Sequence, residues 1–215
     1  MNKKFPIAKE GYPFIFGALI IVLILFFTKT NIILQSPFIL LLLFIIYFFR
    51  DPNREILAAE NDKVLVSPAD GKIIKIERDV QTPYIPEKMI QVSIFLSVFN
   101  VHVNRFPTSG KVVDIKYFPG KFLAAWNDKA SLLNEQTHFV IKHEKSTIIV
   151  KQIAGLIARR IVWWYKINDN FNKGDRFGLI RFGSRVDMFL PSNTSLEIKI
   201  GDKVAGGITK IGTLA

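Results

Sequence analysis

Two long apolar runs near the N-terminus constrain this chain more than any other feature. Residues 14–27 read FIFGALIIVLILFF and residues 38–49 read FILLLLFIIYFF, and neither run contains a charge. Neither shows a polar stripe, and a helix that is apolar all round is buried in a large core or in lipid. With softer edges the runs cover 12–28 and 32–49, close to the lower limit of about 17 residues for a membrane span. We therefore expect residues 1–49 to form a helical hairpin that anchors the chain in a membrane.

The charges around the runs predict the orientation of this hairpin. Three lysines precede the pair, Arg50 and Arg54 follow it, and only Lys29 lies in the connection. Basic residues favour the cytoplasmic side, so we expect both ends in the cytoplasm and the following domain at the inner face of the cell membrane. A cleavable signal peptide is less favoured, because a second apolar run follows directly and no small-residue cleavage site separates the two. A shallow hairpin in one leaflet stays open.

The chain changes character after residue 50. The polar break DPNR (51–54) marks a boundary, and residues 50–215 form the second expected domain. Short runs rich in Val, Ile and Phe alternate there with turn residues, which is typical of a β-sandwich or barrel with few helices. One helix is expected over 122–136, and residues 204–214 resemble the closing hairpin of lipoyl-like barrels. The expected strands cover 72–77, 89–96, 110–117, 146–153, 178–182, 185–190 and 195–200.

The composition excludes several kinds of chemistry. The chain has no Cys, which excludes disulfides, thiolate zinc sites and a Cys nucleophile. Its only histidines are His102, His138 and His143, so any imidazole chemistry uses one of these. The net charge of +11 suits an anionic membrane, an anionic substrate or a nucleic acid. A nucleic-acid binder leaves the hairpin without a purpose, so we expect no nucleic-acid partner, and we see no metal-ligand cluster.

Three short segments contain residues for nucleophilic chemistry. Gly183-Ser184 lies between two expected strands, where such a pair is normally a tight turn. A small residue before a Ser also lets the hydroxyl approach the preceding carbonyl and break the chain there. With His102 in VHVNR and Asp70 in SPADG, Ser184 completes a Ser/His/Asp set. In such a set the His takes the Ser proton and the Asp fixes the His tautomer. The sequence does not show that the three meet.

Several segments together resemble one enzyme family. The chain resembles the short, archaeal-type branch of the pyruvoyl-dependent phosphatidylserine decarboxylases, over most of its length after Arg50 and in the family's order. The matching segments are FFRDPNR (48–54), VSPADGKI (66–73), SIFLSVFNVHVNRFPTSGKV (93–112), YFPGKFLAAWNDKASLLNE (117–135), QIAGLIARRIVWW (152–164) and GDRFGLIRFGSRVD (174–187).

The resemblance implies a self-processing proenzyme. Cleavage between Gly183 and Ser184 would give a β chain, 1–183, and an α chain, 184–215, whose first residue becomes the pyruvoyl cofactor. Asp70 and His102 match the residues that activate Ser184. The pyruvoyl ketone forms a Schiff base with phosphatidylserine, and loss of CO2 gives phosphatidylethanolamine. His102 is the first candidate to return the proton.

Other features are less specific. Arg105, Arg159, Arg160 and Arg185 are candidate contacts for the anionic headgroup, although each also fits an ordinary structural or solvated arginine. The oligomeric state is left open, a homo-oligomer included. The alternative function is a membrane-anchored lipoyl-like adaptor or carrier without catalysis. An adaptor of that kind predicts long coiled-coil heptads, which the sequence lacks.

Overall fold

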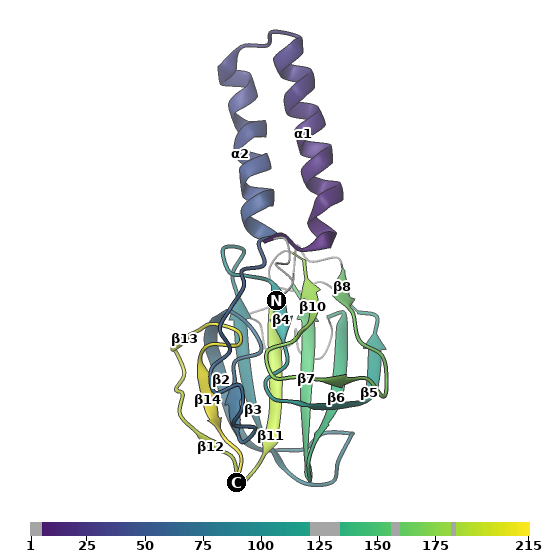
Figure 1. Ribbon diagram of the computed structural model, residues 1–215, viewed down its shortest axis with the longest axis vertical. Helices are drawn as coiled ribbons and strands as arrows, with labels where there is room; N and C mark the ends of the chain where they lie inside the picture. Colours follow the sequence, from purple (N-terminus) through teal and green to yellow (C-terminus); the bar gives the residue numbers. More distant parts are fainter. Residues whose placement is uncertain (1–5, 121–133, 156–159, 182–183) are drawn as a thin grey trace. The chain divides into compact units, whose positions relative to one another are not determined.

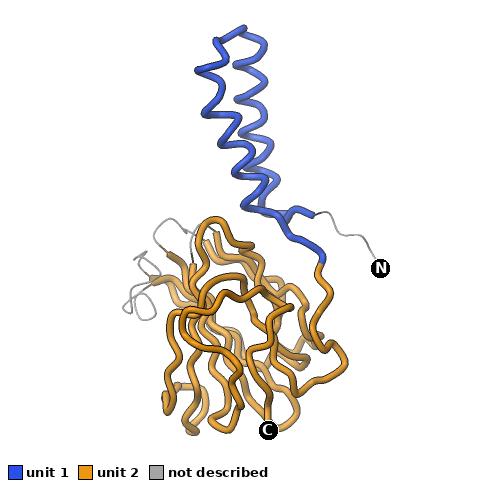
Figure 2. The backbone as a smooth tube through the Cα atoms, turned by 90° about the vertical axis from the view of Figure 1, so that its left-hand side faces the viewer, with its two compact units in different colours: residues 1–53 blue, residues 54–215 orange. Residues whose placement is uncertain are grey.

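The computed structural model describes residues 6–120, 134–155, 160–181 and 184–215. The chain divides into two compact units, residues 1–53 and residues 54–215 (Figure 2). The dividing point lies four residues after the boundary expected from the sequence. Each unit has its own architecture.

The first unit is a helical hairpin. A short 3-10 helix η1 (Lys9–Gly11) leads into α1 (Tyr12–Phe27), and α2 (Ile32–Phe48) returns beside it (Figure 1). Asn31 caps α2, since its side chain accepts a hydrogen bond of 2.9 Å from the backbone N–H of Ile33. At the base, the N–H of Ala8 donates to the carbonyl of Phe49 at 2.8 Å. The sequence therefore predicted both helices and the turn between them.

The hairpin presents apolar side chains outward. Phe27 is 76% exposed and Ile33 is 74% exposed, although both are strongly apolar. The helical stretch Lys9–Phe27 is long and apolar enough to cross a membrane, whereas Ile32–Phe48 is shorter. Apolar surface of this extent is typical of a contact with lipid or with another protein.

The second unit is built almost entirely from strands. Its long strands form an eight-stranded sheet in the order β13-β2-β3-β11-β7-β6-β5-β9, and two three-stranded sheets have the orders β1-β14-β12 and β4-β10-β8. All the pairings are antiparallel. The strands are β1 (Val64–Val66), β2 (Gly71–Val80), β3 (Met89–Leu96), β4 (Val103–Arg105), β5 (Gly110–Phe118), β6 (Gln136–His143), β7 (Ser146–Ala154), β8 (Ile161–Trp163), β9 (Asn170–Phe171), β10 (Arg176–Ile180), β11 (Ser184–Pro191), β12 (Ser195–Leu196), β13 (Lys203–Val204) and β14 (Lys210–Thr213).

The main core lies on one face of the eight-stranded sheet. It joins Val150 and Met188 of that sheet to Leu65 of β1, Ile211 of β14 and Phe177 of β10. The two small sheets therefore cover this face, and the unit is a sandwich. None of the sheets among the described residues closes into a barrel, which decides between the two architectures that the sequence left open.

Three details differ from the sequence prediction. The C-terminal segment is not a closing hairpin, because β13 pairs with β2 whereas β14 pairs with β1 and β12. The expected strand 195–200 is reduced to Ser195–Leu196. The helix expected over 122–136 falls mostly outside the described residues, and its predicted end is wrong because Gln136 begins β6. The β-branched and aromatic residues of THFVIKH (137–143) were the signal for that strand.

The second unit has a core of its own, which leads to a prediction. A chain that begins at Arg54 should fold, unfold cooperatively on heating, and no longer sediment with phospholipid vesicles, because the exposed apolar helices are gone. Circular dichroism and vesicle sedimentation at physiological salt measure both properties. Vesicle binding equal to that of the full chain would show that the β domain itself is the anchor.

Candidate active site

Ser184 is the first residue of β11, a central strand of the large sheet (Figure 1). It pairs with Leu96 of β3 on one side and with Ala154 of β7 on the other. Strand alternation puts its side chain on the core face with Val186 and Met188. The side chain is fully buried, and its Oγ has no hydrogen-bond partner among the described residues. Gly183 lies outside the described residues.

Burial without a partner is unusual for a hydroxyl. Most buried polar atoms are hydrogen-bonded, and an exception calls for an explanation such as a catalytic role. The backbone at Ser184 is paired with a neighbouring strand on each side, while its hydroxyl makes no hydrogen bond to any described residue. This arrangement suits a nucleophile of fixed position.

His102 is fully buried at the start of β4. Its Nδ1 lies 2.9 Å from the carbonyl oxygen of Asn100. A carbonyl can only accept a hydrogen bond, so Nδ1 carries the proton and donates it. In the neutral ring the basic nitrogen is therefore Nε2. The backbone thus sets the tautomer that a general base requires.

Hydrogen bonds join the residues around His102 to β10 and to β7, the neighbour of the strand that begins at Ser184. Gln152 of β7 donates from Nε2 to Oδ1 of Asn104 at 2.8 Å, and both side chains are fully buried. Gln152 pairs with Val186, two residues beyond Ser184. Diagonal neighbours of this kind lie about 7–8 Å apart, within reach of a long side chain. The N–H of Ile180 also faces the carbonyl of His102, at 3.4 Å.

Asp70 lies in the turn before β2, and its carboxylate is held on both oxygens. Arg54 donates from Nη1 to Oδ1 at 2.5 Å and from Nη2 to Oδ2 at 2.7 Å. The N–H of Gly206 donates to Oδ1 at 2.8 Å. The turn also contacts the strand of His102, since the N–H of Arg105 donates to the carbonyl of Pro68 at 2.8 Å. The sequence analysis gave Asp70 the task of fixing the His102 tautomer, but the Asn100 carbonyl already does so.

His138 has a structural role. Its Nε2 lies 2.7 Å from Oε1 of Gln136 and its Nδ1 lies 2.5 Å from the hydroxyl of Tyr84, so the neutral ring is satisfied on both sides. Burial, with a smaller effect of the Lys151 and Lys116 charges, lowers the pKa of His138 to about 3. Burial, with a smaller effect of Asp114, raises the pKa of Tyr84 to about 12.

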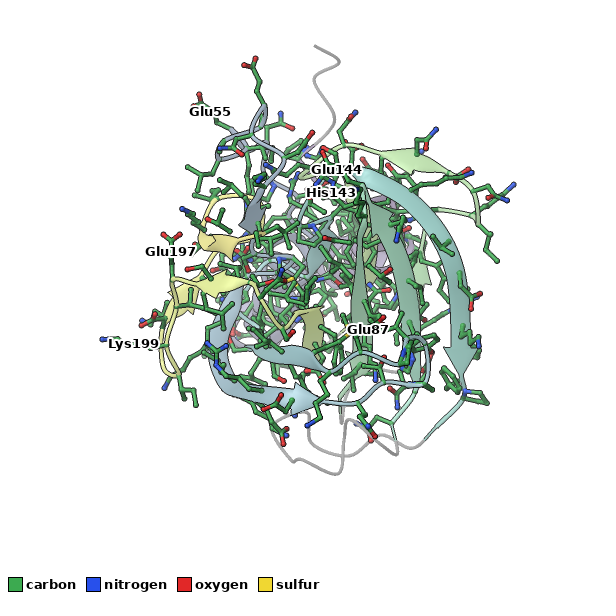
Figure 3. All side chains as sticks on the ribbon, turned by 90° about the horizontal axis from the view of Figure 1, so that it is seen from below. Glu55, Glu87, His143, Glu144, Glu197 and Lys199 are labelled. Carbon is green, nitrogen blue, oxygen red and sulfur yellow. The ribbon has the colours of Figure 1, made fainter. Side chains whose placement is uncertain are left out.

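His143 lies at the other end of β6, beside the turn to β7 (Figure 3). Its Nδ1 donates to the carbonyl of Ser109 at 2.8 Å. The Gln136 end of β6 lies on the same side of the sheet as the start of β11, because Gln136 and Arg185 both pair with Ile153 of β7. At about 3.3 Å per residue, His143 is roughly 23 Å along the strand from that end. His143 therefore lies far from Ser184 along the sheet.

The arginines proposed from the sequence occupy different environments. Arg185 is buried on the opposite face from Ser184, where Nε donates to Asp187 at 2.6 Å and Nη2 donates to Ser93 at 2.8 Å. This arrangement favours a structural role, since breaking a buried ion pair costs about 3–5 kcal/mol. Arg105 is buried and donates to the carbonyl of Gly174 at 3.0 Å. Arg160 is exposed, and Arg159 lies outside the described residues.

The sequence analysis missed several partners in this region. Only the matching segment FFRDPNR marked Arg54 as a candidate site residue in the sequence. Its partner Asp70 lies sixteen residues further on. Gln152 and Asn104 had no signal of their own, because their contact depends on how β4 packs against the sheet. Among the described residues, no cluster of three or more His, Asp or Glu side chains is arranged to hold a metal ion.

Known proteins share much of the sequence of this chain. The family model for phosphatidylserine decarboxylase matches residues 41–212. The chain belongs to the phosphatidylserine decarboxylase family. It is 46% identical to the phosphatidylserine decarboxylase proenzyme of Geotalea uraniireducens (strain Rf4), over 99% of each chain. The proenzyme of Syntrophus aciditrophicus (strain SB) is 46% identical over 96% of this chain and 97% of its own. The proenzyme of Ralstonia nicotianae (strain ATCC BAA-1114 / GMI1000) is 41% identical over the whole of both chains.

Membership of the family confirms the family resemblance seen in the sequence, whereas the archaeal-type branch stays a prediction. It also gives the buried Ser184 hydroxyl a context, because a proenzyme is a precursor that must be processed. The family does not by itself assign roles to Ser184, His102 or Asp70 in this chain, and these roles are taken up below.

The neutral His138 leads to a prediction about acid stability. Its folded pKa is about 3 and its ordinary value is 6.5, so between these values the unfolded chain binds the extra proton. Stability from this residue is complete above pH 6.5 and falls as the pH drops, by at most about 1.4 kcal/mol per pH unit. His138→Gln should give a flatter stability curve between pH 6.5 and 4, measured by urea unfolding. The same slope in both proteins would contradict this assignment.

Proposed function

We propose that the chain cuts itself between Gly183 and Ser184 and then converts phosphatidylserine to phosphatidylethanolamine at the membrane surface. The observation that carries the proposal is the buried Ser184, whose Oγ has no hydrogen-bond partner among the described residues, in a chain of this family. The non-catalytic adaptor is not favoured, because the relatives match over the full chain and are decarboxylase proenzymes.

The cleavage uses only groups of this chain. Nε2 of His102 takes the Ser184 hydroxyl proton, the Asp70 carboxylate supports the positive charge that His102 then carries, and Oγ attacks the Gly183 carbonyl carbon. The peptide C–N bond breaks, the nitrogen of Ser184 gains a proton, and an ester joins Oγ to Gly183. Loss of the α proton of Ser184 then expels the Gly183 carboxylate and leaves dehydroalanine. Its imine tautomer takes up one water and releases one ammonia, which leaves a pyruvoyl group.

The position of Ser184 fits such a group. It begins a strand that is bonded on both sides, so the new end of the chain stays in place after the cut. A pyruvoyl group is an electron sink for the pair left when CO2 departs. Around it, the protonated Nε2 of His102 can return a proton to the substrate carbon.

The rest of the chain brings the lipid to this site. The apolar hairpin holds the domain at the bilayer, and the two basic flanks place the domain in the cytoplasm. Arg160 is exposed and is retained as a contact for the headgroup phosphate. Binding energy from these non-reacting parts lowers the barrier at the reacting centre.

Self-cleavage can be tested on the intact chain. The full-length protein should yield fragments 1–183 and 184–215 on denaturing electrophoresis. Ser184→Ala should stay a single chain, because no hydroxyl is present to attack. Ser192→Ala, at an exposed serine in the same fragment, should be cut like the unaltered protein. A cut at the same bond in Ser184→Ala would overturn the mechanism.

The substrate can be tested separately. The processed protein should release CO2 from phosphatidylserine in vesicles much faster than from free serine at matched concentration, because free serine lacks the phosphate and the bilayer. Borohydride added with substrate should stop the reaction by trapping the pyruvoyl carbonyl. Equal rates on the two compounds would defeat the lipid assignment and leave the pyruvoyl chemistry standing.

A further inference from the structure

The carboxylate of Asp70 has an unusually complete set of donors. Both terminal nitrogens of Arg54 bind it, one on each oxygen at 2.5 and 2.7 Å, and the Gly206 N–H adds a third bond at 2.8 Å. The side chains of Arg54 and Asp70 are only 8% and 14% exposed. Fork-to-fork pairs of this kind are stronger and more directional than single hydrogen bonds.

Arg54 also binds the backbone opposite Asp70. Its Nη1 donates to the carbonyl of Gly206 at 2.6 Å, so Arg54, Asp70 and Gly206 form a closed ring of hydrogen bonds. Gly206 packs against the Asp70 turn, since a Cβ at this position would lie 3.3 Å from Cα of Ala69. The ring therefore leaves the carboxylate a single orientation.

The ring leaves part of the carboxylate available. A carboxylate has about four acceptor positions, two on each oxygen. Two donors occupy Oδ1 and one occupies Oδ2, so one position on Oδ2 is left for a further donor or for electrostatic support of a nearby cation. Arg54 fixes the direction in which that position points.

We propose that Arg54 is a positioning residue for self-cleavage, which acts by orienting the Asp70 carboxylate. This inference rests on the proposed function, since it needs Asp70 to support the cleavage of Ser184. The ring also contains residues from both sides of the proposed cleavage site in the sequence. Arg54 and Asp70 belong to the proposed fragment 1–183 and Gly206 belongs to the proposed fragment 184–215, so the ring joins the two fragments.

The test measures the rate of self-cleavage in newly synthesised full-length chains, by pulse–chase and electrophoresis. Arg54→Met should slow cleavage about 10- to 100-fold, the rate equivalent of one or two charge-assisted hydrogen bonds. Arg54→Lys should be intermediate, because an ammonium group keeps the charge and cannot make the two-pronged contact. Lys210→Met, which removes the exposed ion pair with Glu197, is the matched control and should cleave at the normal rate.

A double-mutant cycle separates positioning from a general loss of stability. If Arg54 acts through Asp70, then Arg54→Met added to Asp70→Asn should slow cleavage no further. If Arg54 were purely structural, Arg54→Met would slow cleavage by the same factor in the unaltered protein and in Asp70→Asn. That result would overturn the proposal. Guanidinium added to Arg54→Ala should restore part of the rate, and no recovery would also count against it.

The failures of the two proposals are distinguishable. If Asp70→Asn cleaves at the normal rate, the role of Asp70 in the proposed function is wrong and the role of Arg54 falls with it. If Asp70→Asn cleaves itself slowly while Arg54→Met and Arg54→Lys cleave at the normal rate, the positioning proposal alone is wrong.

Discussion

The structure depends on the double-sided pairing of β11. This strand lies between β3 and β7 in the eight-stranded sheet, and its first residue is Ser184. A break just before Ser184 therefore leaves residues 185–189 of β11 paired on both sides. Downstream, β13 pairs with β2 and β14 pairs with β1, so fragment 184–215 is held in the fold at three places. A chain with this topology can be cut at the site without losing its architecture.

The same sheet separates its polar groups by face. Ser184 and the Gln152–Asn104 pair lie on the core face, whereas Arg185, Asp187 and His138 lie on the other. Alternation thus keeps the Arg185–Asp187 ion pair away from the Ser184 hydroxyl, although Arg185 is the next residue in sequence. It also removes His138 from the chemistry, because both of its nitrogens are occupied on the far face. His102, with Nε2 as its basic nitrogen, remains the base that we propose for Ser184.

Sequence reasoning was most successful where one physical signal dominated. Apolar runs without a polar face predicted both helices, and runs of Val, Ile and Phe predicted strands such as Met89–Leu96. It failed where pairing partners decide the outcome. Residues 204–214 carry turn signals that suit a hairpin, but their strands join two different sheets. The end of the expected helix at Gln136 belongs to a strand, because pairing with β7 begins at this residue.

The residues of the candidate site also divide into those that the sequence could identify and those that it could not. Ser184, His102 and Asp70 stand in recognisable motifs, so the sequence could name them. The Arg54 ring could not be found in this way, since it joins residue 54 to residue 206 through a turn that forms only in the folded chain. The tautomer of His102 likewise depends on a backbone carbonyl, which no residue type specifies. Contacts of the main chain and contacts between distant residues are invisible to motif reading.

The central claim is that Ser184 becomes the reactive end of a second chain. Mass spectrometry of the smaller fragment tests it most directly. The account predicts a fragment that begins at position 184 and is lighter than the serine peptide by the loss of one ammonia, with a carbonyl that borohydride reduces. A fragment with an intact N-terminal serine, or an unbroken chain of full mass in active protein, would contradict it.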